Sequence, residues 1–237
     1  MEFENFIQSK EFFDYSHSDT PQLLLPKINE EEVKKRLVPS TSDYLVTFST
    51  KSQSYCVGYV DIVNSTKISA SLSAEKLIQY YEIFLNSMSK IIGRFGGRVI
   101  KNIGDCLLFY FPNSVNSTEL GLMNCLNCGL AMTHAYKIIS AEIKSKKLPD
   151  LNYRVSADFG KVILMNTSNS QSIDLIGPPV NMCAKINHFA KNNEFVIGSD
   201  LHQYAKKFVE YKCNEIQSYD VGFRYSYPVY GVTSSYR

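Results

Sequence analysis

The sequence lacks the long hydrophobic run of a membrane-spanning helix. No segment of its 237 residues approaches the ~18–20 consecutive apolar residues that cross a bilayer. The first residues, MEFENFIQSKEFF, carry acidic side chains where a secretory signal would carry basic ones. The hydrophobic content of 44% is typical of globular proteins and excludes wholesale disorder. We therefore expect a soluble, cytoplasmic protein with no membrane insertion.

An excess of charge of either sign is also absent. Lys and Arg number 25 against 23 Asp and Glu, which leaves a formal net charge of +2. Proteins that bind nucleic acids or anionic membranes usually carry a broad basic surface. We therefore expect no nucleic acid among the partners.

Cysteine and histidine lack the spacing of a disulfide framework, a zinc site or a nucleophilic triad. The six cysteines are expected to be free and buried in a chain of this length without an export signal. Cys125 and Cys128 form a CxxC, but no second ligand pair follows at zinc spacing, and the pair falls in a helical pattern. Core packing is therefore the favoured interpretation of this pair.

Residues 1–50 differ from the rest of the chain. Prolines interrupt them, and a charged run over 29–36 is typical of a short helix. No long apolar period appears there. We expect residues 1–53 to form an N-terminal arm packed on the core or on a dimer partner, and residues 54–237 to form one α/β domain.

A regular pattern of strands and helices begins at Tyr55. The pattern predicts strands over 55–62, 98–103, 106–111, 152–160, 161–165 and 194–199. It predicts helices from a Ser73 cap to near Gly93, from about 119 to 144 with Asn116 and Glu119 as a capping box, and over 177–190. The order β-α-β-β-α-β, followed by further β and α, is the ferredoxin-like arrangement, an antiparallel sheet with helices packed on it. Many unrelated functions use this fold, so the fold alone does not decide the activity.

Two aspartates stand at the ends of neighbouring predicted strands. Asp61 closes the first strand, and Asp105 follows Gly104 at the turn of a predicted hairpin. Adjacent strands would bring the carboxylates together, where they raise each other's pKa unless a cation lies between them. Mg²⁺ suits such a site because it takes one or two carboxylates and completes its coordination with substrate phosphates and water. Either aspartate alone is better explained as a solvated turn acid.

Three motifs around these acids strengthen the case for a site. GGRVIKNIGD (96–105) has the form GGxxxKxxGD, DIVNST (61–66) ends the first strand, and DLIGPPVN (174–181) has the form DxxGxxVN. In this order, the three motifs resemble the catalytic domain of the class III nucleotidyl cyclases, the adenylate and guanylate cyclase family. The resemblance covers roughly residues 54–232.

The resemblance implies roles for several residues. Asp61 and Asp105 match the metal-binding aspartates, with the backbone carbonyl of Ile62 as a third ligand, for two Mg²⁺ (or Mn²⁺) ions per site. Lys101 and Asp174 match the positions that select the purine. A lysine can donate to N1 of adenine, and an ionised aspartate can only accept, which suits the adenine amino group and opposes the guanine oxo group. Without the surrounding motifs, this pair would be an exposed strand residue and a loop acid.

Phosphate chemistry is implied for three further residues. Asn181 matches the asparagine that orients the ribose, and Lys185 stands four residues later, where the family has a transition-state arginine. Arginine presents a planar fork to two phosphate oxygens, whereas lysine is a flexible point charge, so we expect slower chemistry rather than none. Arg224 is the nearest match to the basic residue that holds the terminal phosphates. Lys206 and Lys207 compete for that role but are better explained as a solvated pair.

The family builds its sites across a subunit interface. The resemblance implies a head-to-tail homodimer with two composite sites, in which the metal acids and the base-reading residues come from different protomers. The implied reaction converts ATP to 3′,5′-cyclic AMP and pyrophosphate by in-line attack of the ribose 3′-hydroxyl. Three alternatives stay open: a cyclase-like nucleotide-binding module with little activity, a guanylate cyclase, and an enzyme that links two nucleotides. The last is least favoured because no GGDEF-like stretch is present.

Overall fold

The computed structural model describes five stretches of the chain, residues 2–14, 46–112, 118–167, 173–220 and 226–235. The strands are β1 (Val46–Ile62), β2 (Arg98–Ile103), β3 (Cys106–Phe111), β4 (Tyr153–Thr167), β5 (Ile173–Ile176), β6 (Phe195–Gly198), β7 (Tyr211–Asp220) and β8 (Ser226–Ser234). The helices and 3₁₀ turns are α1 (Glu2–Gln8), η1 (Lys10–Phe13), α3 (Ser65–Ser71), α4 (Ala74–Arg94), α6 (Thr118–Ser145), α7 (Pro178–Ile186), η2 (Asn187–Phe189) and α8 (Ser199–Ala205). Among these helices, none is both long enough and apolar enough to span a bilayer.

One mixed sheet organises the molecule, with the strand order β2-β3-β1-β4-β6-β8-β7 and β5 paired beside β4. Within it, β1-α4-β2-β3-α6-β4 forms the predicted ferredoxin-like unit, whose strands pair antiparallel in the order β2-β3-β1-β4. The fold class is therefore confirmed. Beyond this unit, β4 and β6 pair in parallel, so the complete sheet is mixed rather than purely antiparallel.

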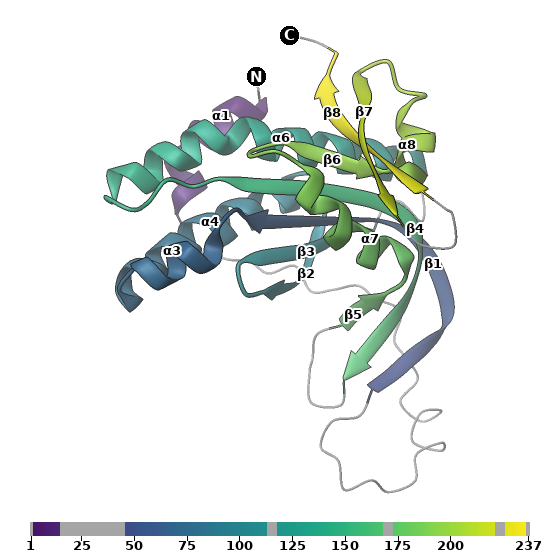
Figure 1. Ribbon diagram of the computed structural model, residues 1–237, viewed down its shortest axis with the longest axis horizontal. Helices are drawn as coiled ribbons and strands as arrows, with labels where there is room; N and C mark the ends of the chain where they lie inside the picture. Colours follow the sequence, from purple (N-terminus) through teal and green to yellow (C-terminus); the bar gives the residue numbers. More distant parts are fainter. Residues whose placement is uncertain (1, 15–45, 113–117, 168–172, 221–225, 236–237) are drawn as a thin grey trace, which may run out of the picture.

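Helices cover both faces of this sheet (Figure 1). The larger core lies between one face and helices α4, α6 and α8, and it includes Phe84, Leu126 and Leu201, none of which is exposed. On the other face, α7 packs through Cys183 and Ile186. Because alternate residues of a strand point to opposite faces, β1 sends Val60 to the larger core and leaves Asp61 on the face of α7.

Local sequence signals account for much of this arrangement. Ser73 begins α4 by accepting a hydrogen bond from the backbone N–H of Lys76 at 3.5 Å, as its position predicts. The cysteines of the CxxC are buried in α6, and all six cysteines of the chain are free. Two differences concern strand length: β1 begins at Val46 rather than Tyr55, and the two strands predicted over 152–165 are one strand, β4.

The described beginning of the chain packs against the domain. Ile7 and Phe12 are buried in the larger core, and the Lys90 ammonium of α4 donates to the backbone carbonyls of Glu11 (2.6 Å) and Asp14. The short helix predicted over 29–36 and the capping residue Asn116 lie outside the described residues. Where the N-terminal arm ends therefore stays a prediction.

A buried carboxyl group joins β4 to the end of the sheet that carries α8. The Asp158 side chain is 1% exposed and accepts hydrogen bonds from the Leu201 backbone N–H (3.1 Å) and the Tyr227 hydroxyl (2.7 Å). Burial raises the pKa of Asp158 from 3.8 to about 7, against the opposing effect of its hydrogen bonds.

Because the pKa of Asp158 is raised, we expect the stability of the protein to decrease as the pH rises. Because its pKa is higher in the native state, protonation favours folding, and the contribution is lost as the pH rises from about 4 through about 7. The loss is at most about 4 kcal/mol, at ~1.36 kcal/mol per pKa unit. In Asp158→Asn, we expect the free energy of unfolding, measured by urea titration, to fall less over this range. The exposed Asp150→Asn is the control, and equal slopes for wild type and Asp158→Asn would contradict the assignment.

Candidate active site

Asp61 and Asp105 meet where β1 pairs with β3. The antiparallel register sets Asp61 opposite Cys106. Asp105, which precedes Cys106, therefore lies beside the Asp61 carboxyl group. Gly104 makes the turn between β2 and β3 with φ at +63°, a conformation that favours glycine. As a result, the two carboxyl groups lie close together, and Asp105 raises the pKa of Asp61. The structure thus brings together the two acids singled out in the sequence.

The raised pKa of Asp61 indicates that the positive charge near this pair does not balance its negative charge. Burial and, after it, the neighbouring Asp105 raise the pKa of Asp61 from 3.8 to about 7, while the positive charge of Arg154 acts in the opposite direction. Next to the pair, the Tyr59 hydroxyl donates to the Cys106 sulfur at 2.8 Å, and burial raises the pKa of both groups.

The donor set suits a divalent cation that shares its coordination with a substrate. Two carboxylates and the adjacent backbone carbonyl of Ile62 offer only oxygen atoms, which Mg²⁺ and Mn²⁺ prefer. In the described stretches, no cluster of three or more His, Cys, Asp or Glu side chains could hold a metal by itself. A cation at Asp61 and Asp105 would therefore need phosphate or water oxygens to complete its coordination.

Arg154 is a member of this site that the sequence reasoning missed. It lies on β4 directly opposite Asp61 of β1, on the same face of the sheet. Its Nε atom is buried, and no described group forms a hydrogen bond with it. No motif in the sequence singles out this arginine, and only the register between β1 and β4 shows which residue it faces.

Lys101 and Asp174 form an ion pair between β2 and β5. The Lys101 ammonium contacts Asp174 Oδ2, while the backbone N–H of Leu175 donates to Oδ1 at 2.8 Å. Both side chains are partly exposed, at 41% for Lys101 and 21% for Asp174, so a ligand can reach them. Lys101 and Asp174 are 73 positions apart in the sequence, yet the fold places the donor ammonium next to the acceptor carboxylate.

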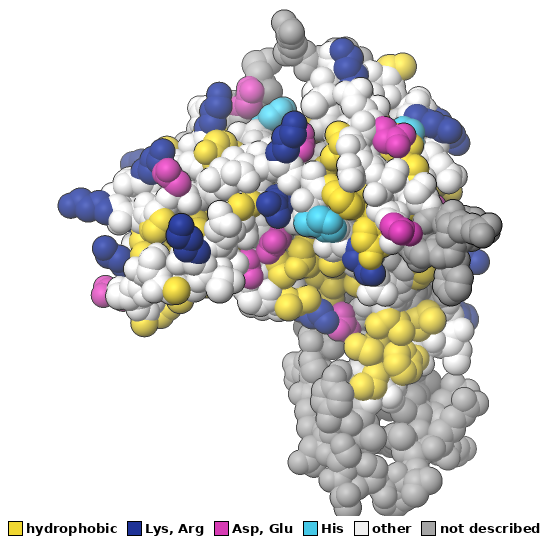
Figure 2. Space-filling model, in the orientation of Figure 1, with side chains coloured by type: hydrophobic (Ala, Val, Ile, Leu, Met, Phe, Trp, Pro, Cys, Tyr) yellow, Lys and Arg dark blue, Asp and Glu magenta, His cyan; other side chains and the backbone are white. Residues whose placement is uncertain are grey.

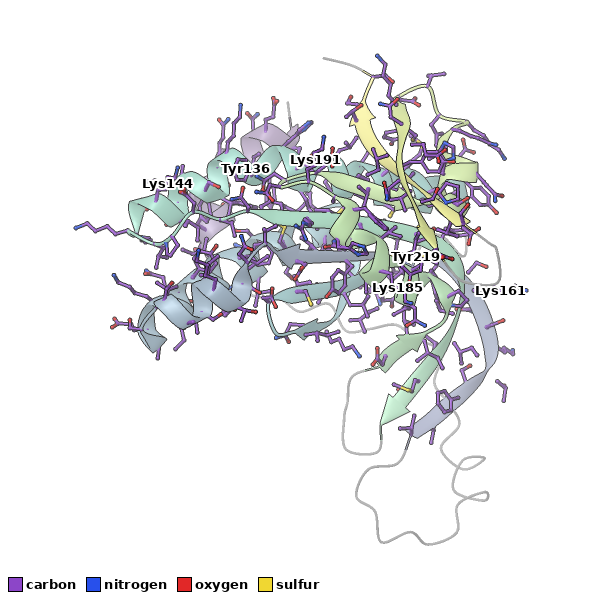
Figure 3. The ribbon with its side chains drawn as sticks, in the orientation of Figure 1. Tyr136, Lys144, Lys161, Lys185, Lys191 and Tyr219 are labelled. Carbon is purple, nitrogen blue, oxygen red and sulfur yellow. The ribbon has the colours of Figure 1, made fainter. Side chains whose placement is uncertain are left out.

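Helix α7 carries Asn181 and Lys185 on one exposed face. Its start requires Gly177, whose φ is +154° and where a Cβ atom would lie 2.5 Å from the Lys161 carbonyl oxygen. One helical turn separates Asn181 from Lys185, so their side chains lie side by side. The Lys185 ammonium donates to the hydroxyl of Tyr219, on β7, at 2.7 Å, and both residues are labelled in Figure 3.

The predicted residues for the terminal phosphates are less well placed by the structure. Arg224 lies outside the described residues. Lys206 and Lys207 are exposed immediately after α8, where the Lys207 ammonium lies 5.5 Å from the ring centre of Tyr204. The role of Arg224 in phosphate binding therefore stays a prediction.

The sequence matches a family model described as the adenylate and guanylate cyclase catalytic domain over residues 48–232. It is 25% identical over 206 residues to a cytidylate cyclase of Staphylococcus aureus, covering 83% of this chain and 49% of that protein. An adenylate cyclase of Streptomyces coelicolor is 21% identical over 182 residues, covering 74% of this chain and 42% of that protein. A cytidylate cyclase of Escherichia coli is 24% identical over 170 residues, covering 68% of this chain and 37% of that protein. The chain thus spans about half or less of the length of these curated relatives.

Solved structures share the fold. The adenylyl cyclase CyaB from P. aeruginosa superposes with a TM-score of 0.72 at 23% identity, covering 80% of this chain and 98% of that chain. The guanylyl cyclase Cya2 superposes with a TM-score of 0.70 at 18% identity, with 77% and 92% covered.

Proposed function

Because the chain belongs to the adenylate and guanylate cyclase catalytic domain family, we propose that it cyclises ATP to 3′,5′-cyclic AMP and pyrophosphate. The observation that carries this proposal is the pair of carboxyl groups, Asp61 and Asp105, at the junction of β1 and β3. In the reaction, the ribose 3′-oxygen bonds to the α-phosphorus and the 3′-hydroxyl gives its proton to water. The bond from the α-phosphorus to the bridging oxygen breaks, and pyrophosphate leaves with its electron pair.

Each group of residues has a distinct part in this reaction. Asp61, Asp105 and the Ile62 carbonyl would hold two divalent cations. When bound, such cations lower the pKa of the attacking hydroxyl and stabilise the leaving pyrophosphate. Asn181 orients the ribose, and Lys185 places a positive charge at the α-phosphate, where negative charge develops.

The Lys101–Asp174 pair supports recognition of a base with an amino group beside an unprotonated ring nitrogen. The ammonium has further hydrogens to donate, and each carboxylate oxygen has a further lone pair to accept. Adenine presents this pattern at its amino group and N1. Guanine and uracil present the opposite pattern, with an oxo group beside an N–H, so they would leave both side chains unpaired.

Cytosine is the second candidate base, and CTP the second candidate substrate. Its amino group and N3 repeat the pattern of adenine, so the Lys101–Asp174 pair accepts either base. Two of the curated relatives described above are named cytidylate cyclases, which favours CTP as the alternative. The two bases differ in ring size, but the ion pair would contact only the amino group and the ring nitrogen, which both bases share.

A homodimer is the assembly that we propose. Figure 2 shows hydrophobic side chains gathered where β1, β4 and β5 extend away from the rest of the sheet. Large hydrophobic side chains on these strands are exposed, and together they form an apolar patch: Phe48 (52%), Ile163 (36%) and Ile176 (37%). Exposed apolar patches of this kind mark interaction surfaces. Ile176 lies two residues from Asp174 on β5, so an interface here would border the base-reading pair.

The metal acids are tested by substitutions that keep their shape. In Asp61→Asn and Asp105→Asn, we expect cyclic nucleotide formation with Mg²⁺ or Mn²⁺ to fall by at least about 10²-fold, because each loses a charged oxygen ligand. Sedimentation velocity should show an unchanged assembly. Asp150→Asn is the matched control, since the Asp150 side chain is 74% exposed and pairs with the exposed Lys144, which lies far from Lys185 in Figure 3. Unchanged turnover in either site variant would remove the metal assignment.

Base selection is tested by direct competition. With equimolar ATP, CTP, GTP and UTP, mass spectrometry of the products should show cyclic AMP or cyclic CMP exceeding the other two by about 10-fold or more. Asp174→Asn should narrow this preference, because an amide donates as well as accepts. Cyclic GMP or cyclic UMP as the main wild-type product would show that the ion pair does not read the base in this way.

If the apolar patch forms the dimer interface, a charged side chain placed in it should weaken the dimer. Ile163→Glu places a charge beside Ile176, its cross-strand neighbour, and should raise the dimer dissociation constant by about 10-fold or more. Val209→Glu is the control, because Val209 is 77% exposed and lies between α8 and β7. Equal dissociation constants for Ile163→Glu and wild type, by analytical ultracentrifugation, would place the interface elsewhere.

A further inference from the structure

The Lys185 ammonium has a specific partner on another element of the fold. Its Nζ atom donates to the Tyr219 hydroxyl at 2.7 Å and lies 5.0 Å from the centre of the Tyr219 ring. The contact joins α7 to β7 across 34 residues of sequence. Neither the helix nor the strand by itself would predict it.

Tyr219 is held in place from two sides. On β7, it pairs with Tyr227 of β8, whose hydroxyl donates to the buried Asp158 carboxyl group at 2.7 Å. Its ring meets that of Phe189 edge-on, with centroids 6.4 Å apart, and packs on the cluster of buried residues around Ile186. The hydroxyl therefore has a position fixed by packing, whereas an exposed lysine alone would be free to move.

The direction of the hydrogen bond leaves two donors side by side. Because Lys185 donates to the phenolic oxygen, the phenolic hydrogen is free to donate to another group, and the ammonium keeps two further hydrogens. An arginine in this position would offer two N–H groups in a planar fork, which fits two oxygens of one phosphate. The pair offers an N–H and an O–H from atoms 2.7 Å apart.

We propose that Lys185 and Tyr219 act together as a two-point hydrogen-bond donor to one phosphate group of the nucleotide. Tyr219 supplies the second donor that lysine lacks, and it is a catalytic residue contributed by β7. This inference rests on the proposed function. It explains how a chain with lysine in place of the arginine retains two directed contacts to a phosphate.

A double-mutant cycle tests the pair. Tyr219→Phe keeps the ring and its packing but removes the hydroxyl, so kcat should fall about 10- to 100-fold with little change in KM. In a Lys185→Arg background, the same substitution should cost less than about 3-fold, because arginine brings both donors itself. The matched controls are Tyr136→Phe and Lys144→Arg, both distant from Lys185 in Figure 3. An equal loss in both backgrounds, or no loss in either, would overturn the inference.

A second measurement does not depend on turnover. The NMR signal of the Lys185 ammonium, identified by its loss in Lys185→Arg, should shift when 3′-deoxy-ATP or 3′-deoxy-CTP binds with Mg²⁺, since neither can cyclise. The shift should be much smaller in Tyr219→Phe. If wild type makes no cyclic nucleotide but this Tyr219-dependent shift is present, the proposed cyclisation fails and the phosphate contact stands. If product forms but Tyr219→Phe changes neither kcat nor the shift, only the paired donor fails. If neither product nor shift is found, both are overturned.

Discussion

The backbone pairing of β1 with β3 holds the carboxyl groups of Asp61 and Asp105 together, although burial and the nearby Asp105 disfavour the anionic form of Asp61. The hydrogen bonds of that ladder set the register, and the register sets Asp61 beside Asp105 whatever the side chains themselves would prefer. On the other side of β1, the pairing with β4 places Arg154 opposite Asp61 and partly offsets the negative charge. Divalent cations would supply the positive charge that this site lacks, and the phosphate oxygens of the proposed nucleotide would complete their coordination.

The proposed contacts with the ribose and the phosphate depend on α7 and on the elements that pack against it. Gly177 allows the helix to begin close to the Lys161 backbone, and the helix then presents Asn181 and Lys185 one turn apart. The exchange of arginine for lysine would weaken a site in which this side chain acted alone. Here β7 brings Tyr219 to the lysine, so the proposed two-point phosphate contact depends on a strand that the motifs do not include.

If Lys101 and Asp174 read the base as we propose, hydrogen-bond chemistry limits the substrate to two of the four common bases. A lysine next to an aspartate distinguishes adenine and cytosine from guanine and uracil, because the two classes exchange donors and acceptors at the same edge. It does not distinguish adenine from cytosine. The choice between them depends on the shape of the surrounding pocket, which a homodimer would complete with a second chain.

Local signals in the sequence determined the order of the elements, the Ser73 cap, the Gly104-Asp105 turn and the fold class, because each depends on residues within a few positions of one another. The three motifs also pointed to the residues of the site. Tertiary structure alone decided the parallel pairing of β4 with β6, the helix α3, and the partners of Asp61 and Lys185, namely Arg154 and Tyr219. These contacts join residues 93 (154 − 61) and 34 positions apart. Strand register and packing between layers set such distances, and neither leaves a periodic pattern in the chain.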